Sequence, residues 1–249
     1  MGIIIKSAQE IDIMRRAGSI VAIVLDKLES SVEPGITTRQ LNKIAEEETK
    51  KNNAIPSFKG YRGFPASICV SINDQIVHGI PSKRVLQEGD IVSIDFGVIY
   101  NGFQGDSART VAVGEISADA QKLMQATREA LMAGIAKVKD GVHLGDVSSA
   151  VQKHVESNGF SVVREYVGHG IGRDMHEDPQ IPNFGTAGRG PILRKGMTIA
   201  IEPMVNAGGW QTKLTESGWT VLTADGSLSA HFEHTIAVTH GKPEILTLV

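Results

Sequence analysis

A short hairpin constrains the fold of this 249-residue chain more than any other feature. Residues 91–94 (IVSI) are predicted to form a strand, and residues 103–113 its return. Between them stands Asn101-Gly102, a dipeptide typical of two-residue turns, because both turn residues need a positive φ. The register that follows pairs Tyr100 with Phe103, Gly97 with Asp106 and Asp95 with Ala108.

Two acids, Asp95 and Asp106, lie on these otherwise apolar or small strands. The predicted register makes them diagonal neighbours on one face, with backbones roughly 7–8 Å apart. Two carboxylates at that separation repel each other unless a cation lies between them. The hairpin therefore predicts half of a metal site.

The composition excludes several classes of protein. Charged residues make up 21% of the chain and the net charge is -3, so no basic stripe indicates nucleic acid or a membrane surface. The single cysteine, Cys69, excludes an internal disulfide framework and is typical of a reducing compartment. No signal peptide and no apolar segment of about 18 residues is visible. We expect a cytoplasmic monomer with no membrane contact and no direct nucleic-acid recognition.

The order of predicted elements favours an α+β domain with an antiparallel sheet covered by helices outside. Capping boxes at Ser7/Glu10 and Thr37/Gln40 predict two N-terminal helices. The segment through Lys6 precedes the first of these helices and is expected to be flexible. Further helices are expected at 117–139 and 146–157, strands at 67–72, 160–164, 197–202, near 219–221 and at 232–238, and a loop from about 172 to 191.

A weak internal repeat accompanies this order. Residues 86–95 align without gaps on residues 193–202, with the leucine, the glycine and the last isoleucine in common and an acid at each end. His78-Gly79-Ile80 is echoed by His169-Gly170-Ile171. Chance similarity of apolar strands is one interpretation. The other is a single catalytic domain, 1–249, with pseudo-symmetric halves at approximately 1–115 and 116–249.

Five side chains could meet in one site. Asp95 and Asp106 come from the hairpin, Glu202 from the repeated strand, Glu233 from the last strand, and His169 from a glycine-rich loop. Each has an ordinary interpretation alone, since an acid can cap a loop and a histidine can fill a core. Four acids on apolar strands are harder to explain as loop caps or core residues, because an unpaired buried carboxylate is strongly unfavourable.

This set predicts metal-dependent hydrolysis. A catalytic zinc typically takes three protein ligands, whereas two divalent ions about 3.5–4 Å apart suit a larger set. The oxygen-rich donors favour Mn, Fe(II) or Co, and Zn would also bind. A bridging water becomes hydroxide near neutral pH, and the metals polarise a carbonyl. His78 and His176 lie outside the set and could donate hydrogen bonds to a substrate.

Several segments together resemble one known family over essentially the full length of the chain. The chain is similar to type I methionine aminopeptidases of the short, bacterial type. The segments that carry the resemblance are FKGYRGFPASICVSINDQIVHGIP, GDIVSIDFG with GDSARTV, YVGHGIGRDMHEDPQIPNF, LRKGMTIAIEPM and GWTVLTADGSLSAHFEHTIAVT.

The resemblance implies the pita-bread fold with internal pseudo-twofold symmetry. It implies removal of the N-terminal methionine from nascent proteins and peptides whose second residue is small, with a dinuclear metal-bound hydroxide attacking the first peptide bond. Nascent polypeptide N-termini are then the partners, with the ribosome as a further candidate. The implied metal ligands, with Asp106 and Glu233 bridging two divalent ions, are Asp95, Asp106, His169, Glu202 and Glu233.

The resemblance also implies roles around the metals. Glu202 would serve as general base or proton shuttle, and His78 and His176 would hold the scissile peptide and stabilise its tetrahedral intermediate. The methionine pocket would be lined by Tyr61, Phe64, Cys69, Met175 and Trp219.

Two pocket positions depart from the commonest family pattern. Phe64 stands where tyrosine is frequent, and Met175 where phenylalanine or leucine is. Both remain apolar, so the departure bears on pocket shape and inhibitor preference. The chain's own start, Met1-Gly2, fits the implied specificity, so we expect it to be a substrate as well. Cys69 has a second interpretation, as a small buried hydrophobe.

Three alternatives remain open at this stage. A proline-specific relative shares the fold and ligand set but normally carries an extra N-terminal domain. A binding protein with the same fold would have lost metal ligands, and all five positions are intact here. A two-metal phosphoesterase would need cations for phosphate, for which Arg109 and Arg173 are the nearby candidates.

Overall fold

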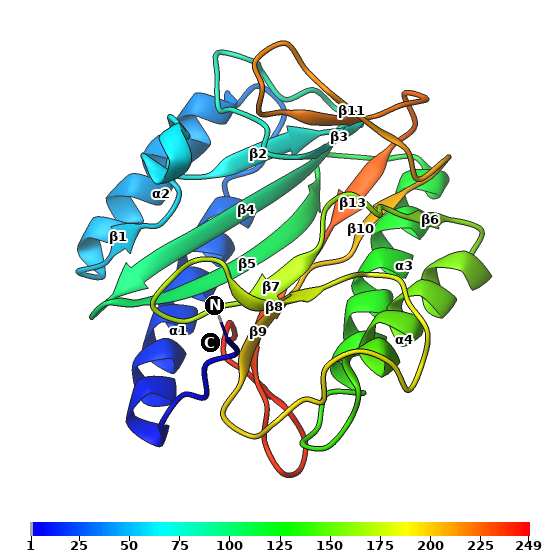
Figure 1. Ribbon diagram of the computed structural model, residues 1–249. Coiled ribbons are helices and arrows are strands. Elements are labelled where there is room, and N and C mark those ends of the chain that lie inside the picture. Colours follow the sequence, from blue (N-terminus) through cyan, green and yellow to red (C-terminus); the bar gives the residue numbers. More distant parts are fainter. Residues whose placement is uncertain (1) are drawn as a thin grey trace.

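The computed structural model describes residues 2–249 and shows an α+β fold. Met1 lies outside the described residues, and so does the predicted processing at Met1. Strands fill the centre, with one helix pair to their left and another to their right in Figure 1. The left pair is α1 (Ala8–Glu29) and α2 (Thr38–Lys51), and the right pair is α3 (Ala118–Ile135) and α4 (Leu144–Ser157).

The strands form four antiparallel groups in the described chain. β4 pairs with β1, β2 and β5, and a five-stranded sheet runs in the order β15-β14-β9-β7-β8. Two three-stranded sheets run β13-β10-β6 and β11-β12-β3. The bounds are β1 Ile55–Pro56, β2 Cys69–Ile72, β3 Gln75–Val77, β4 Ile91–Tyr100, β5 Phe103–Ala112, β6 Ser161–Val162, β7 Gly168–Gly170, β8 Glu177–Ile181, β9 Thr198–Ile201, β10 Met204–Asn206, β11 Thr212–Leu214, β12 Val221–Thr223, β13 Ser229–His231, β14 His234–Ala237 and β15 Glu244–Ile245, with a 3-10 turn at Tyr61–Gly63.

The predicted hairpin is confirmed in detail. Asn101 and Gly102 have φ values of 48° and 79°, as a tight turn between right-twisted strands requires. The register of β4 on β5 pairs Tyr100 with Phe103, Gly97 with Asp106 and Asp95 with Ala108.

The repeat corresponds to equivalent strands. β4 lies between β2 and β5, and β9 lies between β7 and β14. The two His-Gly-Ile tripeptides, which begin at His78 and His169, do not occupy equivalent positions in the two sheets. The repeat matches Ala200 to Ser93, and His169 pairs with Ala200 whereas Ser71 pairs with Ser93. His78 instead follows β3. The division of the chain near residue 115 stays a prediction.

Three expectations about local structure are wrong. The stretch 172–191 contains β8. This strand tolerates Pro179 because β8 lies at the edge of its sheet, where the missing N–H of proline breaks no ladder of hydrogen bonds. His169 lies in β7 rather than in a loop. The expected strand 232–238 is interrupted at Phe232-Glu233, where the Glu233 N–H donates to the Ala108 carbonyl of β5 at 3.0 Å.

The expectation of a flexible segment through Lys6 is also wrong at Lys6 itself. Its side chain is buried, and its backbone N–H donates to the Gly196 carbonyl at 2.8 Å. The Lys6 ammonium forms an ion pair with Glu177. Within residues 2–6, the exposed ones are residues 2–5. Within residues 2–249, no helix is both long and apolar enough to cross a membrane.

Helix α1 packs closely on the strands through a glycine. The Ser7/Glu10 capping box opens the helix as predicted, and its buried side includes Met14, Val21 and Leu28. A Cβ at Gly18 would lie 2.2 Å from the Leu246 carbonyl oxygen, so only glycine permits this approach to the C-terminal segment.

Gly18→Ala should therefore destabilise the fold, although alanine is intrinsically better in a helix by about 1 kcal/mol. The overlap is with backbone, so the helix must shift, at a net cost of about 1–3 kcal/mol. Thermal unfolding should show a Tm lower by several degrees, at roughly 2–4 °C per kcal/mol. Ser19→Ala, on the half-buried neighbour, is the control and should change Tm little. A Gly18→Ala protein of unchanged or raised Tm would contradict the close approach.

Candidate active site

The twelve side chains predicted to bind metal, hold the substrate or line the methionine pocket all line one cavity of about 160 Å³. They come from segments far apart in the sequence, including both strands of the central hairpin, β7 and the region around β13 and β14. The complete lining is Phe58, Tyr61, Arg62, Phe64, Cys69, His78, Asp95, Asp106, His169, Met175, His176, Glu202, Trp219 and Glu233.

The polar side chains gather at the centre. Asp106, His169 and Glu233 are buried, and each offers a donor atom within 4.8 Å of the others. Asp95 lies on β4, on the same face as Asp106 of β5, and Glu202 directly follows β9. This arrangement of carboxylates and one imidazole is a donor set that divalent cations use.

Several of these carboxylate oxygens lack partners. Asp95 Oδ1, Asp106 Oδ1 and Glu233 Oε1 are buried and form no hydrogen bond within residues 2–249. An unsatisfied buried polar group costs about 1–3 kcal/mol, and a charged one more. A cation would satisfy all three oxygens at once, so the site fits a metal.

Burial raises the pKa of every acid in the group. It raises the pKa of Asp106 to about 7. Burial, followed by repulsion from Asp106, holds the pKa values of Asp95, Glu202 and Glu233 well above their usual range. Without a cation the site therefore retains protons, and metal binding would release them.

His169 presents one ring nitrogen to the acids. Its Nδ1 lies 2.9 Å from the Gly170 carbonyl oxygen, so Nδ1 carries the proton and Nε2 keeps its lone pair. Nε2 lies 3.4 Å from Glu202 Oε1. Burial lowers the pKa of His169 to about 4, so the ring is neutral. The flanking glycines are required because a Cβ at Gly168 or Gly170 would lie 2.3 or 2.2 Å from a neighbouring carbonyl oxygen.

The two outer histidines line the same cavity. His176 Nδ1 lies 2.8 Å from the Tyr61 hydroxyl, and their rings stack with centroids 5.4 Å apart. Burial, followed by the neighbouring His169, lowers the pKa of His176 to about 3. His78 has a φ of 60°, rare outside glycine, and burial lowers its pKa. Both rings are therefore neutral and can donate a hydrogen bond from one nitrogen.

The remaining wall is apolar. Phe64 meets Trp219 edge to face with centroids 5.1 Å apart, and Cys69 and Met175 are buried. Phe58, Tyr61 and Phe64 belong to one aromatic loop, residues 56–65, which borders the cavity and also packs in a local core. Burial, and then the negative charge of Asp95, raise the pKa of the Cys69 thiol. A protonated thiol is a poor nucleophile, which favours a packing role.

Two lining residues were not predicted, Phe58 and Arg62. Phe58 belongs to the aromatic loop, and its aromatic character was the available signal. Arg62 has a φ of 49°, and its guanidinium lies 5.3 Å from the Tyr61 ring centroid. Nothing in the sequence distinguishes Arg62 from other surface arginines.

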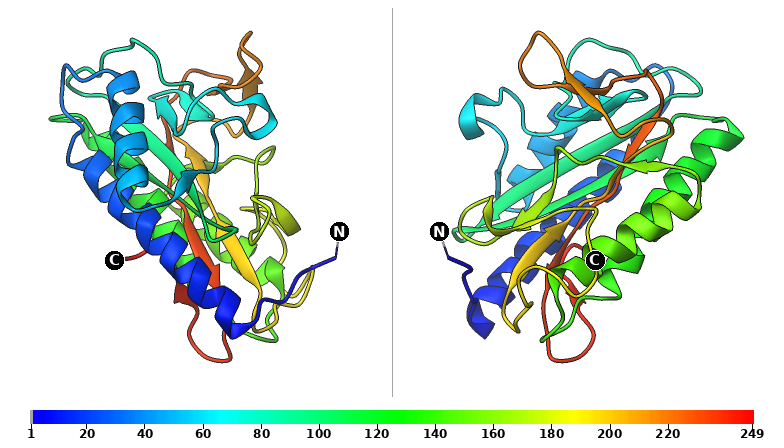
Figure 2. Two further views of the ribbon diagram at one scale, coloured as in Figure 1. Left: turned by 90° about the vertical axis from the view of Figure 1, so that its left-hand side faces the viewer. Right: turned by 45° about the vertical axis from the view of Figure 1, so that its right-hand side comes forward.

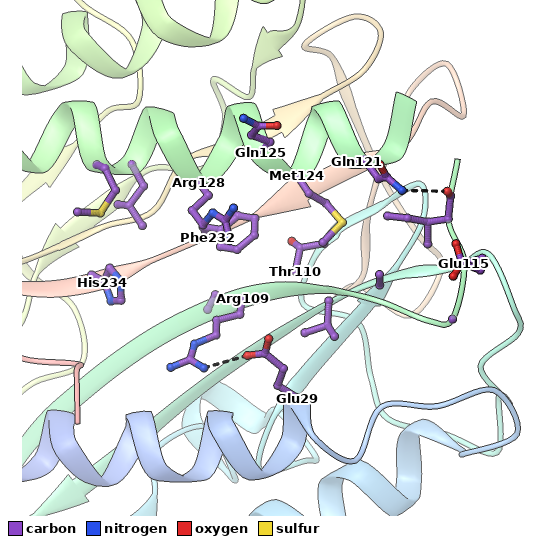
Figure 3. Close-up of a pocket in the computed structure, with 17 residues that line it drawn as sticks. Glu29, Arg109, Thr110, Glu115, Gln121, Met124, Gln125, Arg128, Phe232 and His234 are labelled. Atoms are coloured by element: carbon purple, nitrogen blue, oxygen red, sulfur yellow. Dashed lines mark hydrogen bonds and ion pairs between the residues drawn. The ribbon is translucent and has the colours of Figure 1, made fainter. Parts of the chain in front are cut away.

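A larger cavity of about 750 Å³ lies between α1 and α3 (Figure 3). Arg109, a candidate phosphate ligand, lines this cavity and pairs with Asp26 at 2.5 Å and Glu29 at 3.0 Å. Arg173 lies over the Phe103 ring, 4.3 Å from its centroid. Among the described residues neither Arg109 nor Arg173 lines the acidic cavity, so the two arginines named as phosphate ligands lie outside the site, and the arginine in its lining is Arg62.

Comparison with known proteins gives relatives of the same length. The chain is 57% identical over 247 residues to a methionine aminopeptidase of Clostridium acetobutylicum, with 99% of each chain covered. It is 55% identical to methionine aminopeptidase 1 of Bacillus subtilis, with 99% of this chain and all of the relative covered.

Solved structures agree with the sequence relatives. A methionine aminopeptidase from Thermotoga maritima superposes with a TM-score of 0.98 at 50% identity, with both chains fully covered. A Xaa-Pro dipeptidase from Bacillus anthracis has a TM-score of 0.79 at 25% identity, and this chain spans 61% of it. These neighbours confirm the pita-bread fold. The model of metallopeptidase family M24 matches residues 12–240, and the chain belongs to that family.

Proposed function

We propose that this M24 metallopeptidase removes the N-terminal methionine from nascent proteins and peptides whose second residue is small. The observation that carries the proposal is a cavity with metal-ligating side chains at its centre and apolar side chains on its wall. The relatives named methionine aminopeptidase, which match over the whole chain, support the same activity. Cytoplasmic location, monomeric state and ribosome contact stay predictions.

The ligands of the metal are the five central side chains. Asp106 and Glu233 would hold the divalent metal, because both are buried and each offers a donor atom within 4.8 Å of one on His169. Asp95, Glu202 and the lone pair of His169 Nε2 would complete the set. When bound, the ions supply an acidified water and polarise the scissile carbonyl. Mn, Co, Fe(II) and Zn all suit these donors.

Glu202 is the candidate proton carrier. Its side chain is 14% exposed and faces the cavity, whereas Asp106 and Glu233 are buried. Burial raises the pKa of Glu202, which suits a group that takes a proton from the attacking water and returns it to the leaving amine.

His78 and His176 would hold the scissile peptide. When the Tyr61 hydroxyl donates to His176 Nδ1, the proton of the neutral ring stands on Nε2. That N–H can donate to the peptide carbonyl and to the oxyanion that develops on it. His78 contributes a second neutral ring in the same cavity.

The apolar wall selects the first side chain. Tyr61, Phe64, Cys69, Met175 and Trp219 surround a narrow space suited to an unbranched thioether, because sulfur packs well against aromatic rings. The preference for a small second residue is carried over from the family resemblance. Cys69 would act here by packing.

Asp106→Asn tests the metal site. Removing one negative charge from the proposed metal site should lower bound Mn and reduce methionine release from Met-Ala-Ser by more than about 100-fold, since even outer-shell changes cost 10–100-fold. Metal analysis and a peptide assay measure both effects, with exposed Glu47→Gln as the control. Full metal content and activity in the Asp106 variant would disprove the site.

His78→Ala and His176→Ala test the substrate contacts. Each variant should keep the metal content of the parent protein and lose turnover by about 10²–10³-fold, the cost of one donor at a developing oxyanion. Metal analysis beside kcat separates the two roles. Stoichiometric loss of metal in either variant would make that histidine a ligand instead.

A further inference from the structure

A second cavity, of about 380 Å³, adjoins the candidate active site. Arg62, His169 and His176 line both cavities, so the two meet at these residues. When the first residue of a substrate fills the smaller cavity, the rest of the substrate chain has to extend into a neighbouring space of this kind. The other lining residues of the second cavity are Gly2, Ile4, Val167, Gly168, Glu177, Asp178 and Gln180.

One wall of this cavity is the chain's own N-terminal segment. The segment runs beside the loops around β7 and β8, as both views in Figure 2 show, and it brings Gly2 and Ile4 to the cavity. Ile4 is 44% exposed, so an apolar side chain faces an open space. The lining also includes residues of β8, an edge strand, and sheet edges are common binding sites for extended peptides.

A buried ion pair holds the segment in place. The side chains of Lys6 and Glu177 are 3% and 4% exposed and pair with each other, and Lys6 Nζ also lies 3.3 Å from the Ile4 carbonyl oxygen. Packing around the pair is tight, since a Cβ at Gly172 would lie 2.5 Å from Lys6 Cε. Removing one partner of a buried pair leaves an uncompensated charge, which is costly.

The same pair reaches the loop that carries two site residues. Glu177 Oε1 accepts hydrogen bonds from the backbone N–H groups of Arg173 at 3.0 Å and Asp174 at 3.4 Å. In the sequence, Met175 and His176 lie between Asp174 and Glu177, in the short loop that these hydrogen bonds close. Lys6 is therefore connected through Glu177 to the loop that carries Met175 and His176.

We propose that residues 2–6 form a wall of a subsite for the substrate polypeptide beyond its second residue, and that Lys6 anchors this wall. The inference rests on the proposed function and extends it to the substrate's third and fourth residues. Ile4 would contact an apolar side chain there, and β8 would face the extended backbone.

Peptide length tests the proposal. The parent enzyme with Mn should cleave the hexapeptide Met-Ala-Ser-Leu-Ser-Gly with a higher kcat/KM than Met-Ala-Ser. In Ile4→Ala the ratio of the two kcat/KM values should fall roughly threefold to tenfold, mainly through KM of the hexapeptide, because apolar contact is lost. Ile3→Ala, on the neighbour that does not line the cavity, should keep the ratio.

The anchor is tested by Lys6→Met and Lys6→Arg. Lys6→Met should lower the same ratio, and Lys6→Arg, which keeps the charge, should restore part of it. Failure of the parent enzyme to release methionine from Met-Ala-Ser would disprove the proposed function itself. Cleavage of Met-Ala-Ser with no length preference, or an unchanged ratio in both Ile4→Ala and Lys6→Met, would overturn the subsite alone.

Discussion

Repulsion among buried carboxylates is the constraint on which the rest of this structure depends. Asp106 and Glu233 are buried beside Asp95, and one oxygen of each lacks a hydrogen-bond partner within the described chain. Such an arrangement is unfavourable unless protons or cations compensate it. A divalent metal would compensate these acids together, and the surrounding core offsets the cost of burying them.

The fold brings these acids together through central strands. β4 and β9 each lie between two partners, so the backbones that carry Asp95 and precede Glu202 are fixed on both sides. His169 reaches the same point from β7 because its flanking glycines allow close packing of strands. The apolar wall comes mainly from loops, which in general vary more in shape than strands do.

The sequence predicted those features that local chemistry determines. The turn at Asn101-Gly102 sets the hairpin register, so the shared face of Asp95 and Asp106 followed directly. Acids on apolar strands and a histidine among glycines indicated the central candidates, and the family resemblance supplied the apolar side chains that the structure places in the same cavity. Features that depend on distant contacts were missed, such as the interruption at Glu233, where its N–H bonds to β5, and the burial of Lys6 against Glu177.

Thermal unfolding of the metal-free protein between about pH 7 and 8.5, with and without millimolar Mn²⁺, tests the central claim most directly. The folded-state pKa of Asp106 is raised to about 7 and those of its neighbours are raised as well, whereas the unfolded carboxyls are ionised above about pH 5. The folded chain holds more protons until the pH passes these raised pKa values, so its stability should fall as the pH rises through about 7 and until the neighbouring acids have ionised. The buried histidines, with lowered pKa values, act mainly below about pH 7. We predict that Tm falls without metal and that Mn²⁺ abolishes the fall; a Tm independent of pH and of Mn²⁺ would contradict the account.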